Sequence, residues 1–377
     1  MRLLHTSDWH LGRSLHRADL RDAQRAFLEH LVDVVRSERI DVVLVAGDVY
    51  DRAVPPVDAV ALCEEALVRL RDAGARVVLT SGNHDSARRL GFGGPLIDAA
   101  GVHLRTRPAA AADPVLLTDS HGEVAVYGVP YLEPAAAECS ERSHTGVLGE
   151  AVARIRADAA ARGVARTVVL AHGWVAGGTV SESERDISVG GVGQVPVSLF
   201  DGFSYVALGH LHGQQTLAEH LRYSGSPLPY SFSEASHRKG SWLIELGPRG
   251  VTHAERVPAP VYRRLTVLRG TLDGLLATPP GHEDDFLSVT LTDTSRPEAA
   301  MDKLRARFPH VLVLAFEPEG AAADGRSYRA RVAGRDDLGI AAEFVRHVRN
   351  APPTQGEHAL LVAAFEAVRA GETAEAR

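Results

Sequence analysis

The sequence predicts an α/β fold in which strands form a layered β-sandwich flanked by helices, followed by a small α/β unit and C-terminal helices. Short apolar runs alternate with longer stretches of helical periodicity, which is the pattern of layered α/β proteins. Several of these runs end directly in Asp, Asn or His. Since ligands of such sheets gather where loops leave the carboxyl edge, we expect these polar residues to converge on one cleft.

Five apolar runs account for the strands that carry the predicted site. The first three end at Asp8, Asp48 and Asn83, and the last two precede His172 and His210. Helical periodicity separates the strands, most clearly over residues 22–37 and 57–73. The predicted strands cover residues 2–6, 41–46, 76–80, 167–171 and 203–208.

The sequence pattern changes after these strands. One more strand is predicted at residues 242–246, and the stretch 247–260 is interpreted as a domain boundary. Beyond it, a strand, a short helix, a strand (286–292), a helix (297–308) and a strand (311–316) predict a compact second unit. We therefore divide the chain into domains 1–250 and 258–335 and a terminal segment 336–377.

The terminal segment has helical periodicity broken by the stretch from Asn350 to Pro353, so about two helices are expected. An apolar stripe runs along the second helix and comprises Leu360, Leu361, Ala364, Phe365 and Val368. The stripe could pack on its own domain, but we favour a partner protein that covers it.

Composition narrows the possible classes of protein. The chain of 377 residues is 45% hydrophobic and 24% charged, which is typical of a globular protein. Its N-terminal segment becomes polar too early for a secretory signal, and Cys63 and Cys139 are too few for a disulfide framework, so we expect a cytoplasmic protein. The net charge of −7 argues against a protein that coats nucleic acid, and any contact with DNA must be local.

The polar residues at the strand ends predict a centre with two metal ions. The motifs are Asp8-Trp-His10, Gly47-Asp48, Gly82-Asn-His-Asp85, His172-Gly173 and Gly209-His-Leu-His212. Paired metal ions can polarise a phosphate, generate hydroxide and stabilise a leaving oxygen, and Asp48 is the natural bridging carboxylate. Imidazole, carboxylate and carboxamide ligands suit manganese, iron or zinc better than magnesium, and we favour manganese. A buried histidine such as His172, taken alone, is more often a satisfied hydrogen-bonding group than a ligand.

These motifs resemble those of the calcineurin-like metallophosphoesterases. The longer sequence strings around them resemble the SbcD-type nuclease branch of that family, which is related to the double-strand-break repair nucleases. The matching strings run from residue 3 to about residue 245. They are Thr6-Ser-Asp-Trp-His-Leu-Gly12, Ala46-Gly-Asp-Val-Tyr-Asp-Arg52, Ser81-Gly-Asn-His-Asp-Ser86, Ser181-Glu-Ser-Glu-Arg185, Gly190-Gly191, Ala207-Leu-Gly-His-Leu-His212 and Tyr223-Ser-Gly-Ser-Pro227.

The resemblance implies specific roles for these residues. One metal would be held by Asp8, His10, Asp48 and His212, and the other by Asp48, Asn83, His172 and His210. His84 would then act on the scissile phosphate or the leaving group, with Asp85 orienting its ring. The arginines near the motifs, which are Arg13, Arg52, Arg88 and Arg89, could contact DNA phosphates or simply be solvated.

The resemblance also implies an activity and partners. We expect a metal-dependent DNA exonuclease and endonuclease that acts on DNA ends and hairpins in repair and recombination. It would form a homodimer, with the helix 57–73 as a candidate dimer surface, and would bind an SbcC-type coiled-coil ATPase through its terminal helices. Two alternatives stay open: a phosphatase or nucleotide phosphodiesterase on the same scaffold, and a non-catalytic scaffold that recruits the ATPase.

Overall fold

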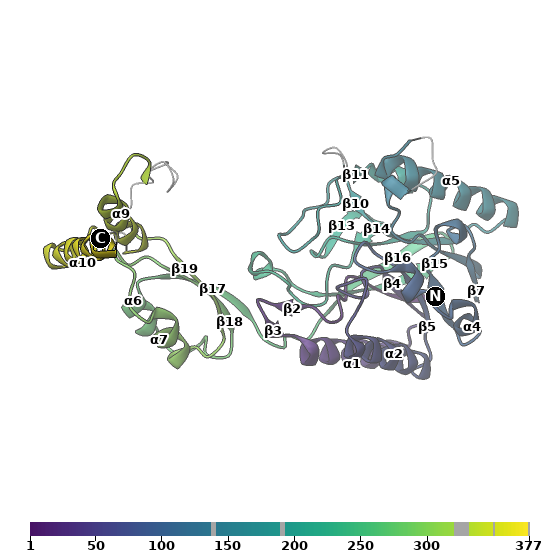
Figure 1. Ribbon diagram of the computed structural model, residues 1–377. Helices are drawn as coiled ribbons and strands as arrows, with labels where there is room; N and C mark the ends of the chain where they lie inside the picture. Colours follow the sequence, from purple (N-terminus) through teal and green to yellow (C-terminus); the bar gives the residue numbers. More distant parts are fainter. Residues whose placement is uncertain (137–140, 189–192, 320–331, 350, 376–377) are drawn as a thin grey trace. The chain divides into compact units, whose positions relative to one another are not determined.

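The computed structural model describes residues 1–136, 141–188, 193–319, 332–349 and 351–375 (Figure 1). The chain divides into two compact units, Met1–Tyr262 and Arg263–Arg377. No helix among the described residues combines the length and the apolar character that a bilayer crossing requires.

Two six-stranded sheets form the frame of the first unit. The first sheet has the order β16-β15-β1-β4-β5-β6, and the second has the order β13-β14-β12-β9-β8-β7. The strands of the first sheet are β1 (Arg2–Thr6), β4 (Val42–Ala46), β5 (Arg76–Thr80), β6 (Val102–Arg105), β15 (Gly240–Gly247) and β16 (Gly250–Pro258). Those of the second are β7 (Val115–Asp119), β8 (Gly122–Gly128), β9 (Thr167–His172), β12 (Tyr205–Gly209), β13 (Gln215–Ala218) and β14 (Leu221–Tyr223).

The two sheets pack against each other through alternate side chains of their strands. Leu44 of β4 faces Leu170 of β9 across a core that includes residues of both sheets. The neighbouring side chains, such as Val43 and Val169, point to the outer faces. Because both faces of these strands are buried, their sequences are continuous apolar runs rather than an alternation of apolar and polar residues.

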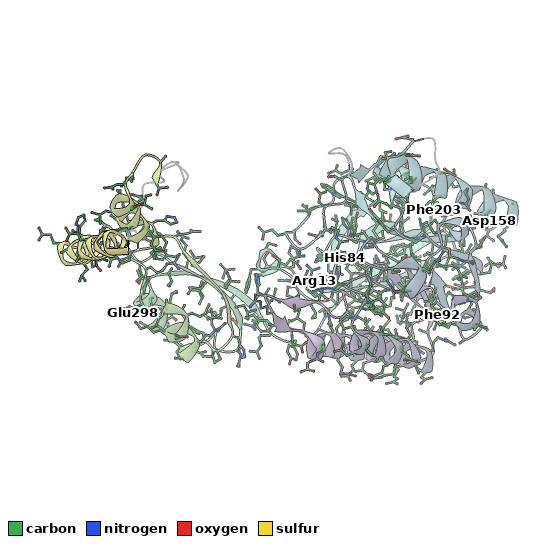
Figure 2. The ribbon with its side chains drawn as sticks, viewed as in Figure 1. Arg13, His84, Phe92, Asp158, Phe203 and Glu298 are labelled. Carbon is green, nitrogen blue, oxygen red and sulfur yellow. The ribbon has the colours of Figure 1, made fainter. Side chains whose placement is uncertain are left out.

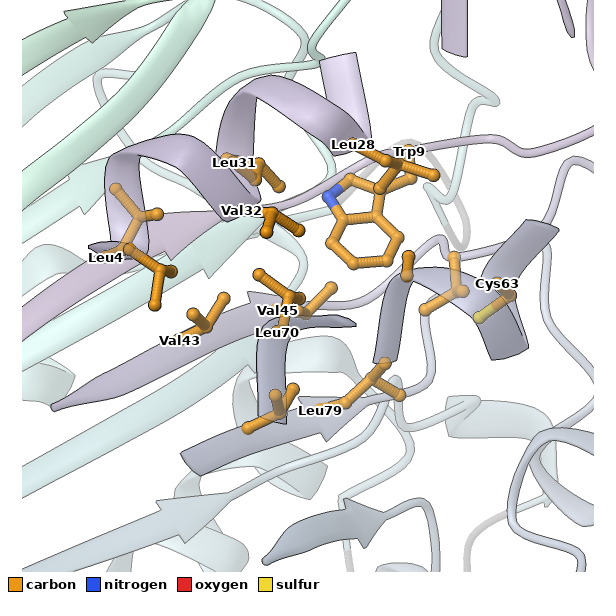
Figure 3. Packing of buried hydrophobic residues seen from close by; sticks show 14 of the residues in the cluster. Leu4, Trp9, Leu28, Leu31, Val32, Val43, Val45, Cys63, Leu70 and Leu79 are labelled. Atoms are coloured by element: carbon orange, nitrogen blue, oxygen red, sulfur yellow. The ribbon is translucent and has the colours of Figure 1, made fainter. Parts of the chain in front are cut away.

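Helices cover the outer face of each sheet. Helices α1 (Arg21–Glu38) and α2 (Val57–Asp72) pack on the first sheet, where Trp9 and Leu31 belong to the same core (Figure 3). Helix α5 (His144–Arg162) packs on the second sheet; the side chain of Ser143 caps its first turn and Gly163 ends it in the left-handed conformation. The result is the layered sandwich flanked by helices that the sequence predicted.

Short elements connect these layers. They are β2 (Ser14–Leu15), β3 (Ala18–Asp19), α3 (Ala87–Leu90), α4 (Gly94–Asp98), η1 (Pro108–Ala110), η2 (Pro134–Ala136), β10 (Trp174–Val175), β11 (Gln194–Val195), η3 (Val197–Phe200) and η4 (Phe232–Glu234).

The parallel pairing of the central strands brings their carboxyl ends together. Strands β1, β4, β5 and β6 are parallel, and so are β8, β9, β12 and β14. In the second sheet His172 at the end of β9 pairs with Gly209 at the end of β12. Loops that are distant in sequence therefore leave the two sheets at neighbouring points.

The interpretation of residues 247–260 as a boundary is wrong over most of its length. This stretch contains β16, which pairs antiparallel with β15 over its whole length and lies at the edge of the first sheet. Most of its side chains are exposed or half-buried, so the strand carries Thr, His, Glu and Arg rather than an apolar run. The first unit continues beyond this strand to Tyr262.

The second unit contains a three-stranded parallel sheet with two helices. Its elements are β17 (Leu265–Gly270), α6 (Leu272–Leu276), β18 (Phe286–Leu291), α7 (Ala300–Arg307) and β19 (Val311–Phe316), in the order that the sequence predicted. Leu287, Leu304 and Phe308 lie in its core. Helices α9 (Asp337–Arg349) and α10 (Gln355–Glu375) belong to the same unit. The separation of domain 258–335 from segment 336–377 stays a prediction, and residues 320–331 lie outside the described residues.

An ion pair between buried Arg166 and half-buried Asp119 joins the two sheets at the amino ends of β1 and β9. Arg166 is buried and donates two hydrogen bonds to Asp119, of 2.6 and 2.7 Å, within the second sheet. Its Nε donates to the carbonyl of Gly247 in the first sheet at 3.0 Å, and the amino group of Met1 donates to Asp119 at 2.9 Å. The Arg166 guanidinium therefore holds the pKa of Asp119 well below its usual range.

Asp119→Asn tests this connection between the sheets. At neutral pH the substitution leaves Arg166 without its anionic partner, so the free energy of unfolding should fall by about 1–3 kcal/mol. Because folding lowers the pKa of Asp119, its contribution is complete above the unfolded value of about 3.9 and is lost as the pH falls below it. Urea denaturation at pH 7 and pH 3 measures both effects.

The exposed carboxylate of Glu123 supplies the control, since Glu123→Gln should change the stability at neither pH. A difference between wild type and Asp119→Asn that does not narrow at pH 3 would contradict the assigned ion pair.

Candidate metal centre

The loops that follow five strands bring the predicted ligands together. Asp8 and His10 follow β1, Asp48 follows β4, and Asn83 follows β5. His172 ends β9, and His210 and His212 follow β12. Asp8, His10, Asp48, His172, His210 and His212 are buried, and Asn83, His84 and Asp85 are half-buried. All the residues predicted for the site therefore lie at one edge of the sandwich.

Three glycines permit the close approach of these loops. A side chain on Gly209 would place its Cβ 1.8 Å from the carbonyl oxygen of Ala46, and one on Gly82 would place it 2.1 Å from Oδ1 of Asp48. Gly47 has a positive φ of 80°, and its Cβ would lie 2.3 Å from Nδ1 of His172. These positions require glycine for lack of space, which explains the glycine before each of the motifs that begin at Asp48, Asn83 and His210.

Four of the predicted ligands have left-handed backbone conformations. Asp8, His10, Asp48 and His210 have φ values of 52°, 44°, 49° and 106°. Such conformations cost about 1–3 kcal/mol each and persist where the surroundings determine them. Here hydrogen bonds between the loops hold them, among them Asp8 N–H to Gly47 O at 3.1 Å and His10 N–H to Asp48 O at 3.0 Å.

One group of donors consists of Asp8, His10 and His212, whose ligand atoms all lie within 4.8 Å of one another. The Nε2 atoms of His10 and His212 face each other at 3.1 Å. Nδ1 of His10 is buried and makes no hydrogen bond with any residue that the structure describes. Two imidazole nitrogens aimed at one point beside a carboxylate are a suitable ligand set for a divalent cation.

A second group of donors surrounds the amide of Asn83. Its Oδ1 lies 2.9 Å from Nε2 of His172 and 3.2 Å from Nδ1 of His210. Nδ1 of His172 bonds the carbonyl of Ala46 at 2.9 Å, which directs Nε2 to the site. Carboxamide oxygen and imidazole again fit a divalent cation.

Asp48 lies between the two groups. Its Oδ2 is 3.6 Å from Nε2 of His10 and 3.5 Å from Nε2 of His172. Its Oδ1 accepts a hydrogen bond from the backbone N–H of His84 at 2.9 Å. This position suits a carboxylate that binds both ions, which is the bridging role that the sequence predicted.

Burial and the opposite charges of the ligands shift their pKa values in different directions. Burial raises the pKa of Asp8 to about 6 and lowers that of His210 to about 3. Burial also opposes ionisation of Asp48, but His172 and His10 outweigh it and hold the pKa of Asp48 well below its usual value. The same attraction outweighs burial at His172 and raises its pKa to about 9. The centre therefore combines a buried carboxylate with a buried, readily protonated imidazole, a charge pattern that bound cations would replace.

His84 stands beside both groups of donors. Its ring centroid lies 4.7 Å from that of His10, at a steep angle of 81°. Its Nδ1 bonds the backbone carbonyl of Asp51 at 2.8 Å, so Nε2 is the nitrogen left for other partners. His84 and Arg13, which lies 3.7 Å from Asp51, are labelled in Figure 2.

The expectation that Asp85 orients the ring of His84 is wrong. The carboxylate of Asp85 accepts hydrogen bonds from the backbone N–H groups of Val49, Tyr50 and Gly82, at 2.9 to 3.0 Å. Asp85 therefore joins the loop after β4 to the loop after β5, and the ring of His84 is oriented by a backbone carbonyl. Burial, together with the charge of Asp48, raises the pKa of Asp85 to about 7.

Sequence reasoning missed the residues that support His212. Its backbone N–H donates to Glu184 at 2.7 Å, and its Nδ1 contacts the hydroxyl of Ser183. Glu234 contacts the same hydroxyl and forms a buried ion pair with Lys239. The only sequence signal was the string Ser181–Arg185, which supplied a resemblance but no role. Gly190 and Gly191 of the same region, and Cys139, lie outside the described residues; Cys63 is a buried free thiol in the core.

Asp48→Asn tests the position between the two groups. The substitution keeps the size of the side chain but removes the negative charge that lies near both groups of donors. The affinity for both ions should therefore fall by at least about tenfold. Titration with manganese, with metal content measured after gel filtration, gives the affinity and the number of ions.

Asp72→Asn, at an exposed position at the end of α2, should leave both affinities unchanged. Loss of only one of the two ions in Asp48→Asn would refute the bridging assignment.

Two protein families match this chain. The calcineurin-like phosphoesterase family matches residues 1–214, and the SbcD_C family, described as the type 5 capsule protein repressor C-terminal domain, matches residues 261–349. A crystal structure of TT1561 of Thermus thermophilus has a TM-score of 0.40 at 14% identity and covers 68% of this chain and 98% of its own. GAP50, the anchor in the inner membrane complex of Plasmodium, has a TM-score of 0.42 at 10% identity and covers 85% and 98%.

The first family match spans more than half of the chain and contains every predicted ligand. Members of this family are hydrolases whose activity depends on divalent metal ions, which fits the two groups of donors around Asp48. The chain belongs to the calcineurin-like phosphoesterase family and carries an SbcD-type C-terminal domain.

Proposed function

We propose that the protein is a DNA nuclease that hydrolyses phosphodiester bonds at DNA ends and in hairpins, as an exonuclease and an endonuclease. The observation that carries the proposal is the candidate metal centre, where Asp48 lies between two groups of donors and His84 lies beside them. The match of residues 261–349 to an SbcD C-terminal domain favours DNA over other phosphoesters.

Seven residues of the centre would hold the two metal ions. Asp8, His10, Asp48 and His212 would hold one ion, and Asp48, Asn83, His172 and His210 the other. Bound in this way, the ions would polarise the phosphate and activate water, and manganese suits the mixed nitrogen and oxygen ligands.

His84 would act on the substrate itself. The carbonyl of Asp51 accepts from Nδ1, which fixes the proton there and turns Nε2 toward the centre. In its protonated form Nε2 can donate to the phosphate or to the leaving oxygen, which makes His84 the catalytic residue. Asp85 supports this geometry indirectly through the loops that it joins.

Arginines near the centre supply positive charge for a phosphate backbone. Arg13 donates to the carbonyl of Ser183 at 2.9 Å and lies over the ring of Tyr230. Its second terminal nitrogen, Nη1, is buried and has no hydrogen-bond partner among the described residues. Arg185 is held near the centre by the carbonyl of Asn83 at 3.4 Å. Arg13, a residue that the sequence left open, is therefore favoured as a phosphate contact, whereas Arg52 is 78% exposed.

A nuclease assay with His84→Gln tests the proposal. With manganese, wild type should shorten linear duplex DNA and open hairpin DNA. His84→Gln should retain both ions and DNA binding but lose about 10²–10⁴-fold in turnover, because a proton donor is removed while the ligands remain. His121→Gln, at an exposed histidine away from the centre, should keep full activity.

The same assay separates the alternatives. Hydrolysis of p-nitrophenyl phosphate or nucleotides with no cleavage of DNA would support the phosphatase alternative on this scaffold. Full repair activity after removal of the metals would support the non-catalytic scaffold. Near-native turnover in His84→Gln would remove it from catalysis.

We further propose that the protein works in the cytoplasm as a homodimer. Helix α2 exposes apolar side chains, with Val57 86% exposed. Phe92, which is labelled in Figure 2, and Leu96 of helix α4 are each 84% exposed. Large apolar side chains at such exposure are typical of a surface that a partner covers.

An SbcC-type coiled-coil ATPase is the proposed partner of the terminal helices. Helices α9 and α10 form an apolar groove of about 420 Å³, lined by Phe344, Val345, Val348, Arg349, Glu357, Leu360 and Leu361. Phe344 is 57% and Leu360 72% exposed. Such a groove fits an amphipathic segment of another protein.

Leu360→Asp tests the docking surface. A charge at Leu360 should abolish co-purification with the coexpressed ATPase, because five of the seven residues that line the groove are apolar and its two charged residues, Arg349 and Glu357, already pair with each other. The metal content of the first unit should stay unchanged. His358→Asp, also exposed on α10 but outside the groove, should co-purify normally. Unchanged binding by Leu360→Asp would contradict the assigned surface.

A further inference from the structure

A buried ion pair beside the metal centre has no part in the proposed chemistry. The side chain of Glu234, on η4, has no exposed surface and that of Lys239 is 8% exposed, and the two form an ion pair. Buried ion pairs add little net stability, because removing both charges from water is costly. Their position next to His212 points to a role in the orientation of that ligand.

All three N–H groups of the Lys239 ammonium are used around this ligand. They donate to Glu234 Oε2, to the backbone carbonyl of His212 at 2.9 Å and to the hydroxyl of Ser226 at 2.9 Å. Lys239 therefore fixes both Glu234 and the loop that carries His212. Oε1 of Glu234 faces the hydroxyl of Ser183, which in turn faces Nδ1 of His212. Oε1 also lies 3.4 Å from Nδ1 of His212 itself.

The directions of these hydrogen bonds follow from the donors available. A carboxylate only accepts, so the single proton of the Ser183 hydroxyl goes to Glu234. The oxygen of Ser183 is then an acceptor, and Nδ1–H of His212 is its donor. With the ring proton on Nδ1, Nε2 of His212 carries a lone pair, and it faces His10 at 3.1 Å.

We propose that Glu234 is a positioning residue for His212: through Ser183 and through its own contact with Nδ1, it keeps the ring proton on Nδ1 and the Nε2 lone pair directed at the position between Asp8 and His10. It thereby controls binding of the ion at that position and leaves the ion held by Asn83, His172 and His210 unaffected. The inference rests on the metal-binding part of the proposed function and is independent of the DNA substrate.

The isosteric change Glu234→Gln shows why the network demands a carboxylate. If the amide oxygen faces Ser183, the amide NH₂ meets the Lys239 ammonium, and two donors oppose each other. If the NH₂ faces Ser183, the hydroxyl must donate to His212 instead, which moves the ring proton to Nε2 and blocks the lone pair. Neither orientation satisfies all the groups.

The experiment measures manganese binding, ion by ion, in wild type, Glu234→Gln, Ser183→Ala and the double variant. Each single variant should bind one of the two ions about 10–100-fold more weakly and the other as wild type does. The double variant should bind no more weakly than Glu234→Gln alone, because the Glu234 carboxylate is the shared end of both contacts with Nδ1 of His212. Nitrogen NMR of metal-free wild type should show His212 protonated at Nδ1, with a shift toward Nε2 in Glu234→Gln.

Ser233→Ala is the matched control, since this exposed serine adjoins Glu234 but does not contact His212. It should bind both ions as wild type does. Thermal denaturation of the metal-free proteins checks folding, and Ser183→Ala carries the test if Glu234→Gln does not fold. The inference would be overturned if Glu234→Gln and Ser183→Ala weakened manganese binding equally at both positions, or left it unchanged at both. A wild-type protein that binds no manganese would instead refute the metal centre.

Discussion

The metal centre depends on the contact between the carboxyl ends of β4, β9 and β12, which belong to two different sheets. Gly209 lies so close to the carbonyl of Ala46 that no side chain fits between them, and the same carbonyl accepts from Nδ1 of His172. Because Asp48 follows Ala46 by two residues, this contact also sets its carboxylate between His10 and His172. The distance between the sheets at this edge therefore determines whether one carboxylate can serve two ions.

The remainder of the first unit keeps this edge in place. The shared core around Leu44 and Leu170 holds the sheets face to face, and Arg166 joins them at the amino ends of β1 and β9. Within the loops, Asp85 ties together the backbones after β4 and β5. These contacts stabilise left-handed backbones that would otherwise be unfavourable, so they set the positions of the candidate ligands.

The sequence predicted the strands that local apolar patterns indicate. It did not predict the edge strand or the side-chain contacts, which depend on residues distant in the chain. The runs 2–6, 76–80 and 311–316 match β1, β5 and β19 because short apolar runs of five or six residues indicate strands. Strand β16 was missed because an exposed edge strand shows no apolar run. The role of Asp85 was wrongly assigned because adjacency to His84 in sequence does not set the direction of a side chain. The sequence pattern indicated no role for Glu234 at the metal centre, because its partner Ser183 lies 51 residues away in the chain.

Anomalous diffraction from crystals grown in manganese tests the central claim most directly. Two manganese peaks should appear, one in contact with Asp8, His10 and His212 and the other with Asn83, His172 and His210, and the carboxylate of Asp48 should contact both. A single peak, or two peaks of which only one lies within bonding distance of Asp48, would contradict the shared centre.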